Sequence, residues 1–264
     1  MVANSFTDEE LLRYSRQILL DDWDMNAQLN LKNSTVLMVG IGGLGCPICQ
    51  ILVRAGVGRL HLVDFDVVDE SNLQRQMLFT SLDVGLSKAK TACEKLRTHN
   101  ELVQVDYTDT KLTHDNIMDF MTKISPSLVI DCTDNFAIRD LLNKSCRAMN
   151  VPLLSNSAIG EVGQIALFTS DTGCYQCLFG VDMGDETTCA TSGVLGSTVA
   201  VIGSMTTQVA LDFLGRHHNP IANELVLWQG RTMTLRKVKF SKDENCAICQ
   251  FTPKTMPDET MSDE

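Results

Sequence analysis

The chain has 264 residues and a mass of 29.1 kDa, which is enough to bury a full core within one large domain. Its 44% hydrophobic content excludes a disordered chain. The 33 acidic residues against 22 Lys and Arg give a formal net charge of -11, so binding to nucleic acid is not expected. Residues 1–30 carry acids and no long apolar run, so no secretory signal is expected.

An uncharged stretch runs from Cys189 to Leu211, and by length alone it could cross a membrane. It is rich in Thr, Ser and Gly and has no flanking cluster of Lys or Arg, so we interpret it as a buried helix. Ten cysteines without a signal peptide indicate a reducing compartment. The sequence therefore predicts a soluble, cytoplasmic protein without a membrane partner.

Predicted helices and strands alternate through the first half of the chain. A capping pattern from Thr7 to Glu10 begins a helix that reaches about Leu20. The next expected elements are a strand at Thr35–Val39, a helix that ends at Ala55, a strand at Arg59–Phe65, a helix at Lys88–Thr98, an extended run at Leu102–Tyr107, a helix at Asp115–Lys123, a buried strand at Leu128–Asp131 and a helix at Asn135–Met149. This alternation predicts a Rossmann-like, doubly wound α/β fold with a mostly parallel sheet.

The pattern changes after Pro152. Extended runs separated by glycine-rich turns follow at Leu153–Ser155, Gln164–Phe168, Glu224–Trp228 and Thr232–Phe240. They favour antiparallel strands that extend the sheet at its C-terminal side. Residues 253–264 are acidic and poor in apolar side chains, so a disordered tail is expected there.

A glycine cluster, Gly40–Gly45, follows the first strand and precedes a helix, where a dinucleotide fingerprint belongs. Gly40 permits a tight turn, Gly42 lets the backbone approach a phosphate, and Gly45 lets the helix pack on the strand. The free N–H groups at the helix start attract an anion. Asp64, at the end of the second strand, can accept hydrogen bonds from a ribose. This pattern fits either NAD or a nucleoside triphosphate.

Two cations favour the triphosphate. Arg75 lies within the segment Ser71–Gln76 shortly after the second strand, and Lys88 opens the next helix. A polyphosphate carries more negative charge than one helix end can balance, so these side chains suit it. The alternative is that both are solvated surface charges.

Aspartates end the buried strand Leu128–Asp131. Asp131 and Asp134 would face the crevice beyond the carboxyl ends of the strands, where open α/β sheets bind ligands. An acid beside phosphates suits Mg²⁺. The alternative is that Asp134 only caps the helix that starts near Asn135.

Two Cys-x₂-Cys pairs, Cys174/Cys177 and Cys246/Cys249, have the local spacing of a tetrahedral structural zinc site that would fix the end of the chain to its middle. Another pair, Cys46/Cys49, has a redox-like spacing, but we interpret it as helix packing because it follows the phosphate loop. We interpret Cys93, Cys132 and Cys146 in the same way. Cys189 follows a polar stretch that should be mobile, and it is a candidate nucleophile.

Together these motifs resemble the ThiF/MoeB/HesA family of ubiquitin-activating-enzyme-like adenylyltransferases. The resemblance runs from about Leu12 to Gln250. It rests on Arg13–Gln17, Gly40–Gly45, Asp64–Asp66, Ser71–Gln76, Lys88, Cys132–Asn135, Cys189–Gly193 and both zinc pairs. It implies a single adenylyltransferase domain over residues 1–252, with a nucleotide-binding half at about 1–150 and a half for carrier and zinc at about 151–252.

The resemblance implies that the C-terminal glycine of a ubiquitin-like sulfur carrier, which ends in Gly-Gly, attacks the α-phosphate of ATP and releases pyrophosphate. It assigns ATP binding to Gly40, Gly42, Gly43, Gly45, Asp64, Asp66, Ser71, Asn72, Arg75, Lys88, Asp134 and Asn135. Asp134 would coordinate Mg²⁺, and Arg16 would reach the ATP site of the other subunit in a homodimer. Cys189 matches a position that in some members attacks the adenylate or joins sulfur transfer.

Sulfur would come from a separate donor, a desulfurase or a rhodanese-like protein. The carrier of molybdopterin synthase is slightly favoured, and the carrier of thiazole synthesis is the alternative. Two other classes stay open: an NAD-dependent oxidoreductase, which would leave Arg75, Lys88 and Asp134 without a task, and an inactive zinc-bound scaffold. Inactive partners usually lose phosphate or metal residues, and this chain has them all.

Overall fold

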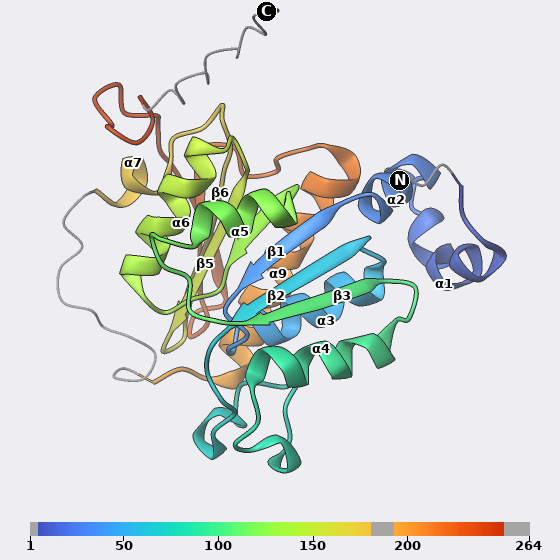
Figure 1. The fold of residues 1–264 in the computed structure, drawn as a ribbon. Coiled ribbons are helices and arrows are strands. Elements are labelled where there is room, and N and C mark those ends of the chain that lie inside the picture. The colour runs from blue at the N-terminus through green and yellow to red at the C-terminus, as the bar shows by residue number, and fades with distance from the viewer. Residues whose placement is uncertain (1–4, 181–192, 251–264) are drawn as a thin grey trace, which may run out of the picture.

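The computed structural model describes residues 5–180 and 193–250 (Figure 1). The helices are α1 (Asp8–Ile18), α2 (Met25–Lys32), α3 (Gly45–Ala55), α4 (Lys88–His99), α5 (Ile117–Ile124), α6 (Phe136–Ala148), α7 (Tyr175–Phe179) and α9 (Gly196–Arg216). The strands are β1 (Thr35–Val39), β2 (Arg59–Asp64), β3 (Gln104–Asp109), β4 (Leu128–Asp131), β5 (Leu153–Ile159), β6 (Val162–Phe168), β7 (Glu224–Gln229) and β8 (Thr234–Lys239). Short 3-10 helices at Glu70–Asn72 and Ser81–Asp83 lie between β2 and α4.

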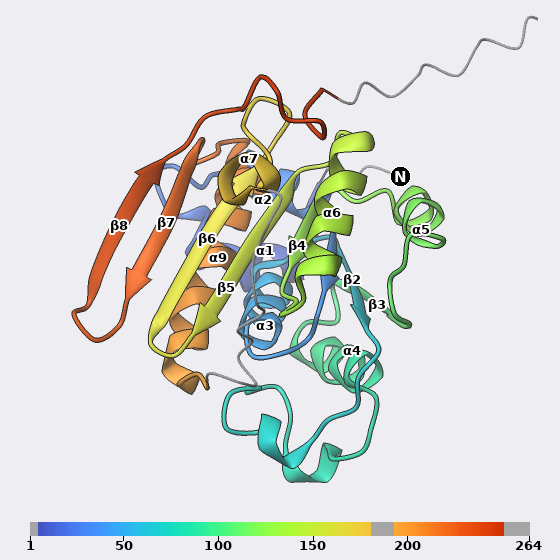
Figure 2. The same cartoon turned by 90° about the vertical axis from the view of Figure 1, so that its left-hand side faces the viewer.

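The strands form one eight-stranded sheet in the order β3-β2-β1-β4-β5-β6-β7-β8. Strands β3, β2, β1, β4 and β5 are parallel, and β6, β7 and β8 are antiparallel to their neighbours. The predicted fold class is confirmed, and Figure 2 shows β7 and β8 at the antiparallel edge. The interpretation of Leu153–Ser155 as antiparallel holds on one side only: it begins β5, which is antiparallel to β6 but pairs in parallel with β4, because α6 provides the crossover between β4 and β5.

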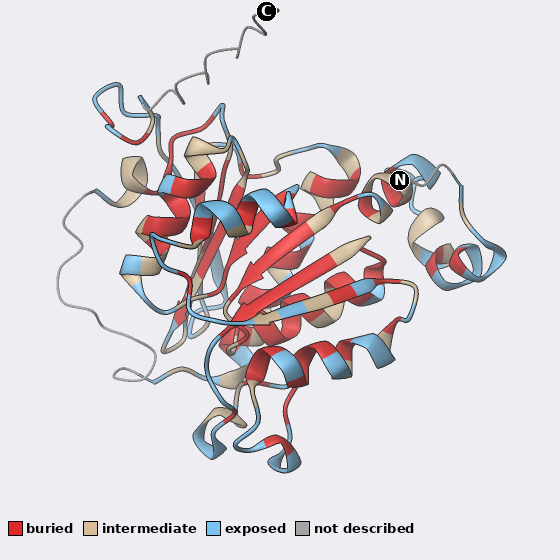
Figure 3. Ribbon diagram, viewed as in Figure 1, coloured by how far each residue is buried: buried red, intermediate tan, exposed pale blue. Residues whose placement is uncertain are grey.

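Helices cover both faces of the sheet, as expected. In β1, Val36 and Met38 pack with α2, α3, α4 and α9, whereas Leu37 and Val39 pack with α5, α6 and α7. This alternation follows from the two-residue period of a strand. Strands β1 and β2 are therefore buried almost from end to end (Figure 3). Such a continuously apolar centre leaves the ends of the strands for polar chemistry.

Helix α9 is the buried helix expected within the uncharged stretch. By length and composition it could cross a membrane, but it packs inside the molecule against α2, α3, β5 and β6. A Cβ on Gly203 would come within 2.5 Å of the Pro47 ring, so this glycine permits close packing of α9 on α3. The small residues of α9 therefore serve internal packing.

Helix α1 begins as expected, because Thr7 and Glu10 form a complete capping box. It lies at the C-terminal ends of α3 and α4: the Tyr14 ring covers Gly56, and Asn100 donates to the Tyr14 hydroxyl over 2.9 Å. The glycine loop lies at the other end of α3. Eleven residues of helix separate the two ends by roughly 16 Å.

Candidate nucleotide and metal sites

The glycine loop turns sharply between β1 and α3. Gly40 has a φ of 92°, and a Cβ there would lie 2.9 Å from the Cys132 carbonyl oxygen. A Cβ on Gly45 would collide with the Gly40 carbonyl. Both glycines thus fit the roles predicted for the turn and for helix packing.

Gly42 has room around it. The nearest atom to a Cβ built there is Nε2 of Gln76, at 3.9 Å. Nothing in the described protein therefore requires glycine at this position for packing. The open space fits the predicted close approach of a phosphate to the backbone.

Asp64 ends β2 beside this loop and is buried. Its Oδ2 accepts from the Ile41 N–H over 2.6 Å, and its Oδ1 accepts from the Asp66 N–H over 2.9 Å. Burial raises the pKa of the Asp64 carboxyl, and these hydrogen bonds only partly oppose that effect. The carboxylate holds the loop, and it also lines the cavity described next.

A cavity of about 390 Å³ lies at the carboxyl ends of the parallel strands. Ten predicted site residues line it: Gly40, Gly42, Gly43, Asp64, Asp66, Asn72, Arg75, Lys88, Asp134 and Asn135. Gly45 and Ser71 do not line the cavity; Gly45 packs under the loop, and the Ser71 hydroxyl donates to Asp69 over 2.5 Å. The sequence motifs therefore converge on one site, at the place where an open α/β sheet binds ligands.

The two cations reach this cavity from different elements. Lys88 is buried at the start of α4, and its Nζ lies 3.0 Å from Oδ2 of Asp66. Arg75 donates from Nη1 to the Ser71 carbonyl over 3.0 Å. Since Lys88 is 6% exposed, it is not the solvated surface charge of the alternative interpretation.

Asp134 is exposed at the cavity, and within the described residues its side chain has no hydrogen-bond or ion-pair partner. The N-cap of α6 is Asn135, whose Oδ1 accepts from the Ile138 N–H over 3.2 Å. The alternative that Asp134 caps this helix is therefore wrong. A free carboxylate facing the space beside two cations has the hard oxygen donor that Mg²⁺ prefers.

Several residues that line the cavity were not predicted from the sequence. Gln76 belongs to the quoted Ser71–Gln76 motif, is 3% exposed, and has an unpartnered buried Oε1. Lys111 follows β3, and its Nζ lies 5.7 Å from the centre of the Phe65 ring. Lys111 could have been found from its position just after β3, because the carboxyl ends of β3 and β2 lie at the same edge of the sheet, where Asp64 is.

Arg16 does not line this cavity. It is exposed on α1, at the opposite end of α3 from the glycine loop. Figure 1 shows α1 at the right-hand edge of the molecule. Arg16 cannot act on its own subunit's cavity from this position.

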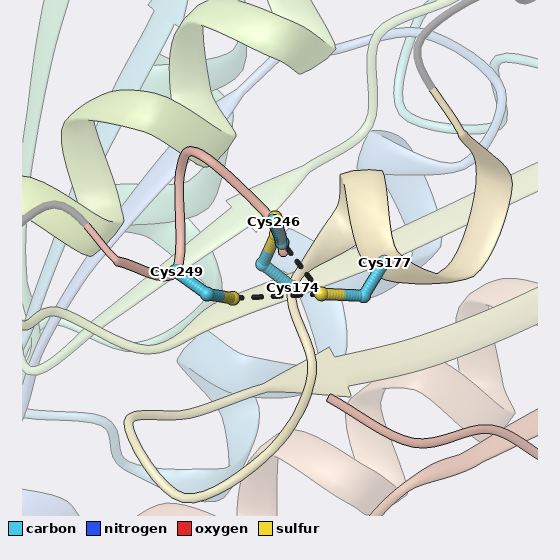
Figure 4. Close-up of side chains that lie close together, drawn as sticks. All are labelled: Cys174, Cys177, Cys246 and Cys249. Atoms are coloured by element: carbon cyan, nitrogen blue, oxygen red, sulfur yellow. Dashed lines mark hydrogen bonds between the residues drawn. The ribbon is translucent and has the colours of Figure 1, made fainter. Parts of the chain in front are cut away.

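The four cysteines of the predicted zinc site lie together (Figure 4). Their sulfur atoms are all within 4.8 Å of one another, with Cys174 3.8 Å from Cys177 and 3.6 Å from Cys246. A tetrahedral zinc with bonds of about 2.3 Å places its sulfurs about 3.8 Å apart. The donor set and its geometry therefore fit zinc.

Nearby donors support thiolates in this cluster. Nη2 of Arg147 lies 2.9 Å from the Cys249 sulfur, and the Asp243 N–H lies 3.4 Å from the Cys177 sulfur. Burial raises the pKa of Cys249, but hydrogen bonds with Arg147, Cys177 and Cys174, together with the charge of Arg147, more than offset this and lower it to about 7. A thiolate is the form that binds a metal.

The other described cysteines are buried. Burial raises the pKa of Cys46 to about 12 and that of Cys49 well above its ordinary value, so this pair lacks the low pKa of a redox site. Burial also raises the pKa values of Cys93, Cys132 and Cys146. This supports the interpretation that they are packing residues. Cys189 and the tail predicted at 253–264 lie outside the described residues.

We expect the purified full chain to carry about one zinc ion per chain, because its four thiolates match a closed structural site. A Cys246→Ser variant should lose most of the metal and melt at a lower temperature, since metal binding contributes to folding. Elemental analysis and thermal melts measure both effects, with Cys93→Ser as a control that keeps the metal. A chain purified without chelator that contains no zinc would contradict the prediction.

We expect Gly42→Ala to weaken ATP binding while leaving the melting temperature close to that of the parent. The added methyl group meets no atom of the described residues closer than 3.9 Å, but it fills the space predicted for a phosphate. Gly40→Ala should instead lower the melting temperature, because of its positive φ and the Cys132 carbonyl. ATP titrations with melting curves distinguish the two glycines, and equal melting losses for both would refute the assignment.

Comparison with known proteins agrees with this site. The model of the ThiF family matches residues 14–248. The molybdopterin-synthase adenylyltransferase of Escherichia coli is 39% identical over 245 residues, covering 92% of this chain and 98% of that protein. The sulfur carrier protein ThiS adenylyltransferase of Escherichia coli is 38% identical over 244 residues, covering 92% and 96%.

A solved structure of Escherichia coli MccB with MccA-N7isoASN superposes with a TM-score of 0.80 at 22% identity, covering 93% of this chain and 75% of that one. At this identity the similarity supports the fold alone. The family match and the named relatives confirm the prediction of an adenylyltransferase. The chain belongs to the ThiF family.

Proposed function

We propose that this protein adenylates the C-terminal glycine of a small ubiquitin-like sulfur carrier, with the carrier of molybdopterin synthase favoured. The observation that carries the proposal is the convergence on one cavity of the glycine loop, the cations Arg75 and Lys88, and the unpartnered carboxylate of Asp134. The relatives named above act on sulfur carriers of two kinds at nearly equal identity. Those names support a sulfur carrier as the substrate and leave the choice of carrier to experiment.

The chemistry follows from the charges. A carboxylate is a poor electrophile, so the carrier's terminal carboxylate attacks the α-phosphorus of ATP, the bond to the pyrophosphate oxygen breaks, and an acyl-adenylate forms. Asp64 would hold the ribose, the loop at Gly42 would approach the phosphates, and Arg75 and Lys88 would balance the charge on the leaving pyrophosphate. Preplaced cations stabilise charge that develops in such a transition state.

Asp134 is the residue that would hold Mg²⁺. When bound, the ion would neutralise phosphate charge and orient the triphosphate. Among the described residues, the Asp134 side chain has no hydrogen-bond or ion-pair partner, so its carboxylate is free to bind the ion. Asn72 lines the same cavity and would contact the phosphates.

The active form would be a homodimer in the cytoplasm, in which Arg16 reaches the cavity of the partner subunit. Residues 1–150 would bind the nucleotide, and residues 151–252 would bind the carrier and the structural zinc. A separate protein would donate the sulfur. Leu12 on α1 and Leu19 at its C-cap are 78% and 72% exposed, and such exposed apolar side chains beside Arg16 support a face that a second copy covers.

The test is the exchange of labelled pyrophosphate into ATP, run with each purified carrier. Exchange that depends on a carrier ending in Gly-Gly is expected, faster with the molybdopterin type than with the thiazole type. Faster exchange with the thiazole type would reassign the substrate. No exchange with either carrier, together with stabilisation of the fold by NAD and not by Mg-ATP, would favour the oxidoreductase alternative.

We expect Cys189→Ala to keep pyrophosphate exchange near the parental rate, because the carrier supplies the nucleophile in adenylation. Any loss should appear only in the later transfer of sulfur to the carrier. The measurement compares exchange with thiocarboxylate formation in the same preparation. A folded variant that has lost exchange would contradict this separation of steps.

A further inference from the structure

Helix α6 carries three polar side chains, Arg139, Asn143 and Arg147, which we call the α6 ladder. They are four residues apart, so they lie along one stripe of the helix. Arg139 and Asn143 are 5% and 2% exposed. The proposed adenylation gives none of the three a direct task. Their contacts lead from the turn that carries Asp134 to the four-cysteine cluster.

Arg139 holds the turn at the first end. Its Nη2 donates to the Thr133 carbonyl over 2.5 Å and to the Asn156 carbonyl over 3.1 Å. The Thr133 carbonyl belongs to the peptide bond that leads into Asp134. Because the Asp134 side chain has no described partner of its own, its position depends on this backbone.

Asp131 also holds the turn that carries Asp134, through hydrogen bonds from Thr133. This fully buried carboxylate accepts from the Thr133 N–H over 3.0 Å and from the Thr133 hydroxyl over 2.7 Å. It lies 3.7 Å from Nε of Arg139. Burial alone would lower the pKa of Arg139, but Asp131 offsets this and raises it, so the guanidinium stays charged. A buried, fully partnered ion pair of this kind fixes geometry more than it adds stability.

Asn143 is the middle residue of the stripe. Its Nδ2 lies 3.7 Å from the Cys174 sulfur, and its Oδ1 accepts from the Tyr175 N–H over 3.0 Å. The Tyr175 side chain in turn interacts with Arg139. Arg147, one step further, contacts the Cys249 sulfur and the Thr172 carbonyl. Both Cys-x₂-Cys pairs are thus tied to α6.

We propose that the α6 ladder holds the Asp134 turn in register with the four-cysteine cluster, so that metal bound at the cluster positions Asp134. This rests on the proposed function, in which Asp134 acts on the ATP phosphates. Arg139 and Asn143 are positioning residues, since they reach the reaction only through the backbone of Thr133 and Asp134. The proposed ribose and phosphate contacts lie in the glycine loop, at the end of β2, in the segment 71–76 and at the start of α4. In the described part of the chain, the hydrogen bonds of the ladder go to other segments.

The test uses the full chain with its metal, the same chain after the metal is stripped with a chelator, and an Asn143→Ala variant. The matched control is Lys144→Ala, the next position of α6, where the side chain is 52% exposed and, among the described residues, forms an ion pair only with Asp140. Hydrogen–deuterium exchange is read without nucleotide at residues 132–136 and at the glycine loop. Metal content is measured in every sample.

Stripping the metal and Asn143→Ala should each speed exchange at 132–136 by about tenfold, the size of one lost hydrogen bond, with the glycine loop unchanged. In carrier-dependent pyrophosphate exchange, kcat should fall by about tenfold while KM for ATP stays within about twofold. Lys144→Ala should change neither quantity. The split between kcat and KM separates positioning from a general loss of structure.

Unchanged exchange at 132–136 in both samples would overturn the proposal. An equal rise at 132–136 and at the glycine loop would also overturn it, because that pattern means global destabilisation. If the parent chain shows no activity with any carrier, the proposed function fails. The hydrogen-exchange comparison still decides the link between the cluster and the Asp134 turn in that case.

Discussion

Asp134→Asn should reduce carrier-dependent pyrophosphate exchange by on the order of a thousandfold at saturating ATP. The substitution removes a full negative charge and nearly preserves the size of the side chain. If Asp134 holds Mg²⁺ against the phosphates, the loss weakens charge balance in the transition state by several kcal/mol, about the size of this rate effect. Exchange of labelled pyrophosphate is the measurement.

The structure indicates that this substitution leaves the stability of the fold unchanged. Asp134 has no partner among the described side chains, and the N-cap of α6 is Asn135, so folding does not depend on the charge at position 134. The melting temperature of Asp134→Asn should therefore equal that of the parent. The matched control is Asp140→Asn on the nearby helix α6, where the change breaks an exposed ion pair with Lys144. A folded Asp134→Asn protein with near-parental turnover would remove Asp134 from the mechanism.

The sequence alone could not decide between the two roles proposed for Asp134. Asp134 and Asn135 are adjacent, and both Asp and Asn are common N-cap residues, so the sequence does not show which of them caps α6. The backbone decides: Asn135 has the extended conformation of an N-cap, and its side chain reaches the Ile138 N–H. The neighbouring carboxylate is then free for a ligand.

Much of the fold and site could be predicted because the signals are local. Strands β1, β2 and β4 are short buried runs, and the glycine loop is a spacing pattern with a steric cause at Gly40 and Gly45. The zinc pairs could be predicted from spacing, although only the folded chain shows that they meet. Gln76 was missed because a glutamine inside a motif carries no chemical signal until its buried, unpartnered oxygen is seen.

The direction of β5 could not be read from Leu153–Ser155. Three extended residues look the same in either direction, and the crossover through α6 sets the parallel pairing. The α6 ladder was invisible for a similar reason. Its polar residues at helical spacing resemble a solvated face, and only the packing of α6 against the cysteine cluster and the Asp134 turn shows that Arg139 and Asn143 are buried and Arg147 is half-buried.

Arg16 leads to the second large effect. On one chain it lies at the end of α3 that is remote from the cavity, roughly 16 Å of helix away. If it contributes to adenylation, it does so at the cavity of a second copy. We expect Arg16→Ala to reduce pyrophosphate exchange by on the order of a hundredfold or more, because it removes one preplaced cation from the reacting phosphates.

Mixing two inactive proteins tests this placement. In a dimer of one Arg16→Ala chain and one Asp134→Ala chain, action across the interface leaves one site with both residues intact. Random exchange of equal amounts makes half of the dimers mixed, so about a quarter of the parental activity should return. Action within one chain would restore none, since every site would lack one residue. Mass spectrometry of differently tagged chains verifies that subunits exchange. Verified mixed dimers without activity would show that Arg16 does not act on the partner's cavity. The proposed role of the homodimer in adenylation would then be wrong.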